Sequence, residues 1–145
     1  MPFMWADTLL AAERSHLLRL VLWGGASVLT GTALLAVLRV RGQRSPLLEL
    51  FALVTAVWGA VDMGLATWGL RSLEVRNLAA ATRFDRFLWL NVGLDMGYVM
   101  VGLTLLIIGW RGARRAGLIG AGIGVIVQAL ALVILDLLLA GQISR

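Results

Sequence analysis

Two aspartates lie inside apolar segments of this 145-residue sequence, where a charged group is costly. Asp62 belongs to the segment WGAVDMGLATWGL and Asp95 to the segment NVGLDMGYVMVGL. Ionisable side chains in such segments commonly bind a proton, an ion or a polar ligand. Two carboxylates in contact and away from water do not both ionise readily, so one of them would hold or share a proton.

Other polar side chains accompany the two aspartates. Asn91 and Tyr98 lie about one turn to either side of Asp95, and Trp58 lies one turn before Asp62. These five residues are the primary candidates for binding a proton, a cation or a small polar ligand.

Three further polar residues are secondary candidates. Gln128 and Asp136 lie in the last apolar segment, where we expect them to support helix packing, and Arg19 lies near the start of the first. The single histidine, His16, is expected at the membrane surface.

The composition indicates a polytopic membrane protein. Sixty per cent of the residues are apolar, the mean hydropathy is +0.90, and the apolar residues form four blocks. The first block could begin earlier, near Asp7, as an interfacial stretch. The sequence thus predicts one all-α domain over residues 1–145, an antiparallel bundle of four transmembrane helices. Their expected ranges are 17–39, 47–70, 87–110 and 116–140.

The longest link has the sequence RSLEVRNLAAATRFDR and contains neither glycine nor proline. It predicts a short interfacial helix between transmembrane helices 2 and 3.

Spacing predicts that the two aspartates lie at one depth. Asp62 lies nine residues before Arg71, and Asp95 lies nine residues after Arg86. The two carboxylates would therefore meet if helices 2 and 3 pack side by side. The helical faces that carry the two aspartates also carry small residues, which let helices pack closely, so both aspartates should point inward. These residues are Thr55, Gly59, Ala66 and Gly69 on helix 2, and Gly102 on helix 3.

Several functions are excluded or disfavoured by the residues the sequence lacks. The absence of cysteine excludes disulfides and thiolate sites, and the absence of lysine excludes a retinal-type Schiff base. One histidine cannot build a bis-histidine haem site or a di-iron site. No nucleophile-and-base pair, metal cluster or phosphate loop is recognisable, so a membrane enzyme is the least favoured class of function. We expect no cofactor and no metal.

The positive charge indicates lipid rather than nucleic acid as a partner. The net charge of +5 comes from arginines in the links, where they would face lipid headgroups.

Four spans place both termini on one side of the membrane. The dense arginines of the two short links favour a cytoplasmic position for those links, with both termini outside. These arginines are Arg39, Arg41, Arg44, Arg111, Arg114 and Arg115; the other side holds Arg14, Arg19, Arg71, Arg76, Arg83, Arg86 and Arg145.

The combination N-x-x-x-D-M-G-Y in the third of four helices resembles a family of small bacterial four-helix membrane proteins. The resemblance rests on Asn91, Asp95, Gly97 and Tyr98. It implies a location in the bacterial inner membrane, and the family has no assigned function.

Two function classes remain. In the first, Asp62 and Asp95 bind a proton or a cationic ligand in a transporter, channel or sensor. Such a small chain would dimerise, and the glycine-rich faces of helices 1 and 4 are the candidate contacts. In the second, the chain is a structural or accessory subunit of a larger membrane complex, with its polar residues used in packing. Copurification separates the two, because a stable homo-oligomer favours the first.

Overall fold

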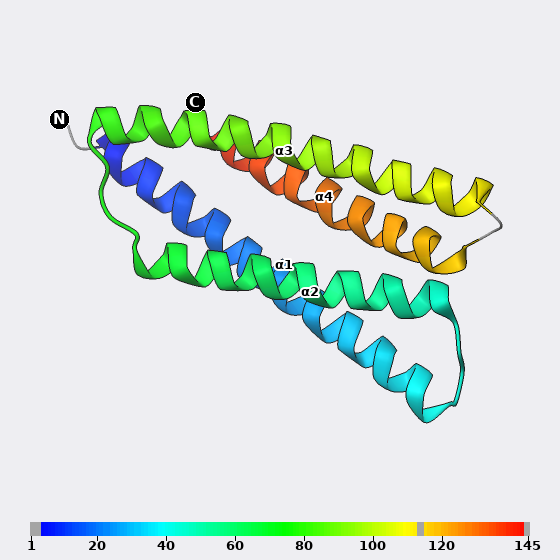
Figure 1. The fold of residues 1–145 in the computed structure, drawn as a ribbon. Coiled ribbons are helices and arrows are strands. Elements are labelled where there is room, and N and C mark those ends of the chain that lie inside the picture. The colour runs from blue at the N-terminus through cyan, green and yellow to red at the C-terminus, as the bar shows by residue number, and fades with distance from the viewer. Residues whose placement is uncertain (1–3, 113–114, 144–145) are drawn as a thin grey trace.

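The computed structural model describes residues 4–112 and 115–143; Arg114 and Arg145, counted above among the arginines, lie outside them. The described chain is all-helical (Figure 1). Every helix is long and apolar enough to cross a membrane. The helices are α1 Met4–Val40, α2 Pro46–Arg71, α3 Leu78–Arg111 and α4 Ala116–Ile143.

Two helices begin well before the residues expected from hydropathy. α1 starts at Met4, since neither glycine nor proline interrupts the chain before Gly24. α3 starts at Leu78, where the Asn77 side chain caps the helix by accepting a hydrogen bond from the backbone N–H of Ala80 at 2.9 Å.

The expected separate helix between α2 and α3 is wrong. Residues 73–77 are not helical, and residues 78–86 form the first turns of α3. No glycine or proline separates them from the apolar part of that helix, so nothing breaks the backbone hydrogen-bond pattern.

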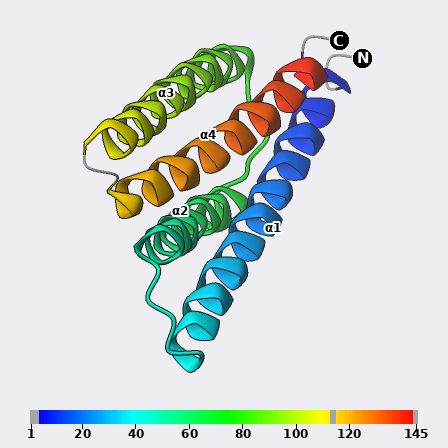
Figure 2. The ribbon, with the colours of Figure 1, turned by 90° about the vertical axis from the view of Figure 1, so that its right-hand side faces the viewer.

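The helices are arranged in space in the order α1, α2, α4, α3 (Figures 1 and 2). α2 packs against both α1 and α4, whereas α3 packs only against α4 among the described helices. No Cα atoms of α2 and α3 come within 8 Å of each other in the described ranges. The condition under which Asp62 and Asp95 would meet directly is therefore not met, because α4 lies between α2 and α3.

Glycines on two faces of α4 explain its central position. A methyl group at Gly120 would collide with the backbone carbonyl of Leu47 in α2. A methyl group at Gly122 would lie 2.6 Å from the carbonyl oxygen of Gly102 in α3. With no side chain at either position, α4 can be approached closely from both sides.

α1 and α2 also touch through glycines. A Cβ at Gly24 would lie 2.6 Å from the carbonyl oxygen of Gly59, and a Cβ at Gly59 would lie 2.6 Å from the carbonyl oxygen of Gly24. Further along the pair, Gly31 meets Ala52 and Ala56. The glycine-rich faces of helices 1 and 4 are thus buried within the chain. Dimerisation itself stays a prediction, but these faces are already occupied by contacts within the chain.

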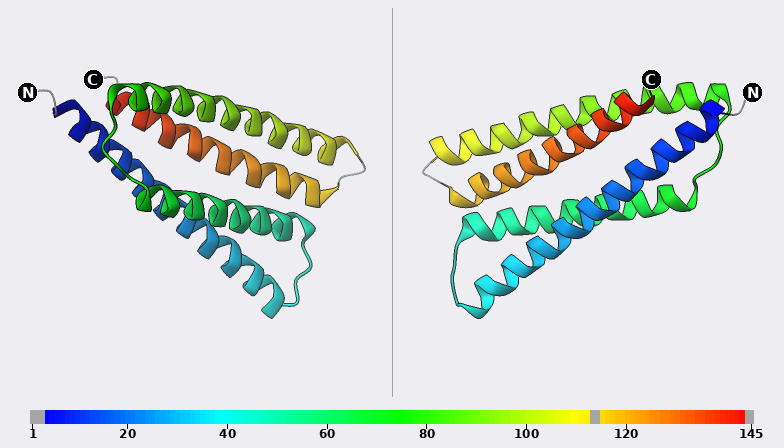
Figure 3. Two further views of the ribbon diagram at one scale, coloured as in Figure 1. Left: turned by 60° about the vertical axis from the view of Figure 1, so that its left-hand side comes forward. Right: turned by 180° about the vertical axis from the view of Figure 1, so that it is seen from behind.

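The start of α1, the end of α4 and the link 72–77 lie at one end of the molecule (Figure 3). We call this the terminal end. The opposite end holds the link 41–45, the end of α3 and the start of α4, and is called the short-loop end.

Candidate functional site

One buried ionisable residue from each helix takes part in a common cluster. Asp136 of α4 places Oδ1 3.2 Å from Nε2 of His16 in α1, and both side chains are more than nine-tenths buried. The charge of Asp136 also acts on Asp62 of α2 and on Asp95 of α3, which are each 7% exposed. We call these four residues the carboxylate cluster.

Several polar atoms in and beside the carboxylate cluster have no hydrogen-bond partner in the described part of the chain. They are Nδ1 of His16, Oδ2 of Asp62 and Nη1 of the neighbouring Arg19. No ion pair within 4 Å joins Arg19 to a carboxylate of the described residues. An unsatisfied buried polar atom costs about 1–3 kcal/mol, so each of these atoms is available to form a hydrogen bond with a ligand.

A second polar pair lies between the cluster and the terminal end. Glu13 is 5% exposed, and Arg76 of the link donates to it twice, from Nε at 3.0 Å and from Nη2 at 2.5 Å. The guanidinium group also lies 4.7 Å from the centre of the Phe84 ring. Because Glu13 lies one turn from His16 on α1, titratable groups continue from the surface link to the cluster.

The side of the cluster facing the short-loop end is closed by a hydrogen-bonded layer. Trp23 donates its indole N–H to Oε1 of Gln128 at 2.8 Å, and Nε2 of Gln128 donates to the Ser27 hydroxyl at 3.1 Å. Gln128 is only 2% exposed, so this network joins α1 to α4 inside the bundle.

An aromatic pair completes this layer. The rings of Trp58 and Tyr98 meet edge to face, with centroids 5.0 Å apart. The contact bridges α2 and α3, whose backbones do not approach. Tyr98 is 38% exposed, so its ring lies at the edge of the bundle rather than in the interior. Because α4 holds the two helices apart, the ring reaches Trp58 along the edge of the bundle.

A family model described as a family of unknown function, DUF6992, matches residues 19–137. The chain belongs to DUF6992. The matched residues include all three aspartates of the carboxylate cluster, while His16 precedes them. The match agrees with the expected membership of a family of unassigned function. No curated protein and no solved structure matches the DUF6992 chain.

The structure brings together some of the sequence candidates and separates others. Asp62, Asp95 and Asp136 interact, whereas Gln128 lies in the layer beside them. Asn91 is half-buried one turn from Asp95, and its side chain makes no hydrogen bond within the described chain. The three aspartates do not form a ready metal site, since no group of three His, Asp or Glu residues in the described ranges could hold a metal ion.

Sequence reasoning missed His16 and Glu13. His16 was expected at the surface, but it is 6% exposed and is the partner of Asp136. The detectable signal was a buried stripe at three- and four-residue spacing, which continues the glycine face of α1 toward the N-terminus. The stripe consists of Ala6, Leu9, Glu13 and His16.

The hydrogen bond from Arg76 to Glu13 raises the pKa of Arg76 above its usual value, although partial burial acts in the opposite direction. A raised arginine pKa stabilises the fold at every pH below the unfolded value, and the gain is lost only as pH rises through the folded value. Arg76 therefore remains charged under all ordinary conditions.

Replacing Arg76 by glutamine should release the link from α1. Glu13 would remain buried without its cation, so the link should open about tenfold more often. The measurement is the rate of cleavage after Glu74, an exposed link residue, by a glutamate-specific protease. Arg83→Gln is the control, because Arg83 is exposed and forms no ion pair with the described residues. Equal cleavage of both variants would show that the pair does not fix the link.

Proposed function

We propose that this DUF6992 chain crosses a membrane four times as an antiparallel bundle and binds a proton in the carboxylate cluster, as part of proton-coupled transport or sensing. The observation that carries the proposal is the convergence of His16, Asp62, Asp95 and Asp136, one from each helix, in the buried interior. Such groups are costly within a membrane unless they serve a purpose.

A proton suits this cluster better than a larger ligand. His16 uses Nε2 toward Asp136 and leaves Nδ1 buried without a protein partner. An imidazole with one nitrogen engaged and the other open can accept a proton on one side and release it on the other. Oδ2 of Asp62 provides a further open acceptor. The Glu13–Arg76 pair then marks the route from the terminal end.

The charges at the two ends support an orientation in a bacterial inner membrane. In the described residues the short-loop end holds five arginines, Arg39, Arg41, Arg44, Arg111 and Arg115, and one acidic residue, Glu49. The terminal end mixes arginines with Asp7, Glu13, Glu74 and Asp85. An excess of arginine in short links favours the cytoplasmic side, which would place both termini outside.

The proposal is tested in vesicles that contain the purified chain and a pH-sensitive dye. Under an imposed proton gradient, the wild type should acidify the interior faster than protein-free vesicles do. Asp62→Asn and Asp95→Asn should fall to the protein-free rate. Asp7→Asn should behave as wild type, because Asp7 is exposed near the start of α1. A wild-type rate equal to that of protein-free vesicles would rule out proton transport and leave sensing.

The alternative is a structural or accessory subunit. Its support is the satisfied network of Trp23, Gln128 and Ser27, which holds helices together and leaves no open polar atom on Gln128. Copurification distinguishes the two proposals: a stable chain or homo-oligomer supports the proton-binding protein, and recovery only with larger partners supports the subunit.

A further inference from the structure

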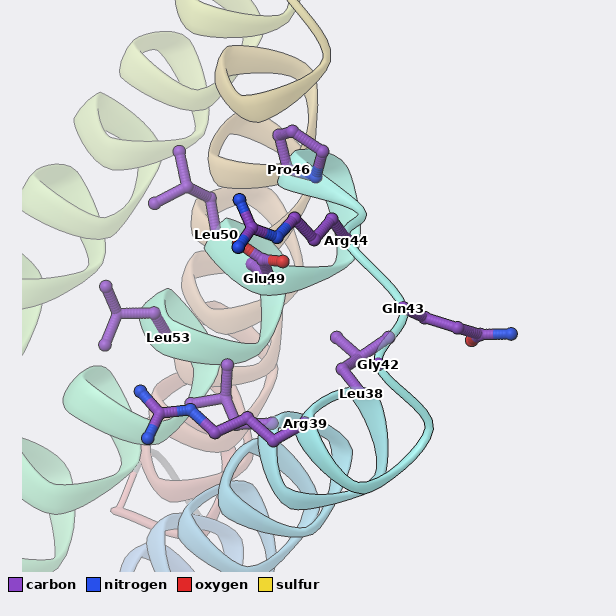
Figure 4. Close-up of a pocket in the computed structure, with 10 residues that line it drawn as sticks. Leu38, Arg39, Gly42, Gln43, Arg44, Pro46, Glu49, Leu50 and Leu53 are labelled. Atoms are coloured by element: carbon purple, nitrogen blue, oxygen red, sulfur yellow. The ribbon is translucent and has the colours of Figure 1, made fainter.

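A pocket of about 660 Å³ lies at the short-loop end, far from the carboxylate cluster (Figure 4). The end of α1, the link to α2 and the first turns of α2 form its walls. Arg39 and Arg44 line it together with Leu35, Leu50 and Leu53. Both guanidinium groups extend toward the side on which Leu50 and Leu53 lie, whereas Gln43 points away (Figure 4).

The pocket lining changes from cationic to apolar along the helix axes. Leu35 lies four residues before Arg39, and Leu53 lies seven residues after Pro46, the first residue of α2. At 1.5 Å per residue, Leu35 lies about 6 Å deeper in the bundle than Arg39, and Leu53 lies about 10 Å deeper than Pro46. A ligand that fills the pocket would therefore combine an anionic group with an apolar chain.

The charge around the pocket favours an anion. Glu49, the one acidic residue among the described residues of this end, also lines the pocket, and its Oε1 already accepts a hydrogen bond from the backbone N–H of Ser45 at 3.2 Å. Arg39 and Arg44 form no ion pair within 4 Å in the described part of the chain. Guanidinium groups bind phosphate well because their planar donors match its oxygens.

We infer that this pocket binds an anionic phospholipid, with its phosphate on Arg39 and Arg44 and an acyl chain along Leu50 and Leu53. The inference rests on the membrane location proposed above but not on proton binding by the carboxylate cluster. A free phosphate would leave the apolar part of the pocket unfilled, so the lipid accounts for the whole lining.

Native mass spectrometry of the full chain in detergent tests the inference, with phosphatidylglycerol titrated as the probe. One phosphatidylglycerol should bind per chain. Affinity should fall by about fivefold when either arginine is replaced by glutamine and by about 25-fold in Arg39→Gln/Arg44→Gln. Arg41→Gln is the matched control: it removes the same charge from the same end of the molecule, but Arg41 does not line the pocket. Its affinity should stay within about twofold of wild type.

Three results would overturn the inference. An equal loss in Arg41→Gln would show a diffuse charge effect, and equal binding of phosphatidylcholine would show that the anionic group is not recognised. Displacement of the lipid by inorganic phosphate at equal concentration would make phosphate the ligand. Asp62→Asn should bind phosphatidylglycerol as wild type does, so failure of the proton proposal would be visible separately. Circular dichroism of every variant checks that the helices remain folded.

Discussion

Gly59→Val should separate α1 from α2 and lower the free energy of unfolding by about 2–3 kcal/mol, since the added side chain has no room to relax. A Cβ at residue 59 would lie 2.6 Å from the carbonyl oxygen of Gly24 and 2.6 Å from Cβ of Ser27. The first of these atoms belongs to backbone, so the helices themselves would have to move apart. Such a shift would also disturb Ser27 as the acceptor of Gln128.

Gly64→Val provides the matched control for this substitution. Gly64 lies in the same helix, but nothing is within 4 Å of the position of its Cβ. Both variants thus change helix propensity equally, and only one introduces a collision. Equilibrium unfolding by sodium dodecyl sulfate in mixed micelles, followed by tryptophan fluorescence, measures the difference. Equal stability of the two variants would contradict the close contact between α1 and α2.

The sequence was sufficient to predict the helices and the face on which the polar residues lie. Apolar blocks of transmembrane length gave the four helices, whose observed ends differ mainly where α1 and α3 extend further. Small residues spaced along one face of α2 correctly placed Asp62 inside, at 7% exposure. These properties are local, because they depend on periodicity and on residue size.

The order of the helices could not be obtained by the same reasoning. Helices 2 and 3 are neighbours in the chain, and the matching depths of Asp62 and Asp95 left their direct packing open. The decisive feature was in α4, where Gly120 and Gly122 permit close approach on two different faces. Since α4 is the last helix, its position between α2 and α3 depends on contacts between residues distant in the sequence.

The same arrangement explains why Asp136 was undervalued. The sequence predicts a packing role for it, yet its neighbour is His16, and its charge acts on both other aspartates. Because α4 lies centrally, one of its side chains can lie near residues of all three other helices. Asp136 is therefore the residue through which the other members of the carboxylate cluster are connected.

Asp136→Asn should change the protonation of Asp62 and Asp95 although neither residue is altered. The substitution keeps the shape of the side chain and removes one negative charge from the cluster. The titration of the two remaining carboxyl groups should then change, because each loses a neighbouring negative charge. An effect of this kind requires that the three carboxylates share a dry environment, which is the central claim about the site.

Infrared difference spectroscopy of the membrane-reconstituted chain measures this directly, as carboxyl bands followed through a pH titration. Bands of Asp62 and Asp95 are assigned by their loss in Asp62→Asn and Asp95→Asn, and Asp7→Asn serves as the control for an exposed carboxylate. We expect Asp136→Asn to displace both assigned titrations, while Asp7→Asn removes only its own band. If Asp62 and Asp95 titrate in Asp136→Asn as they do in the wild type, the three aspartates are independent and the proposed proton site is wrong.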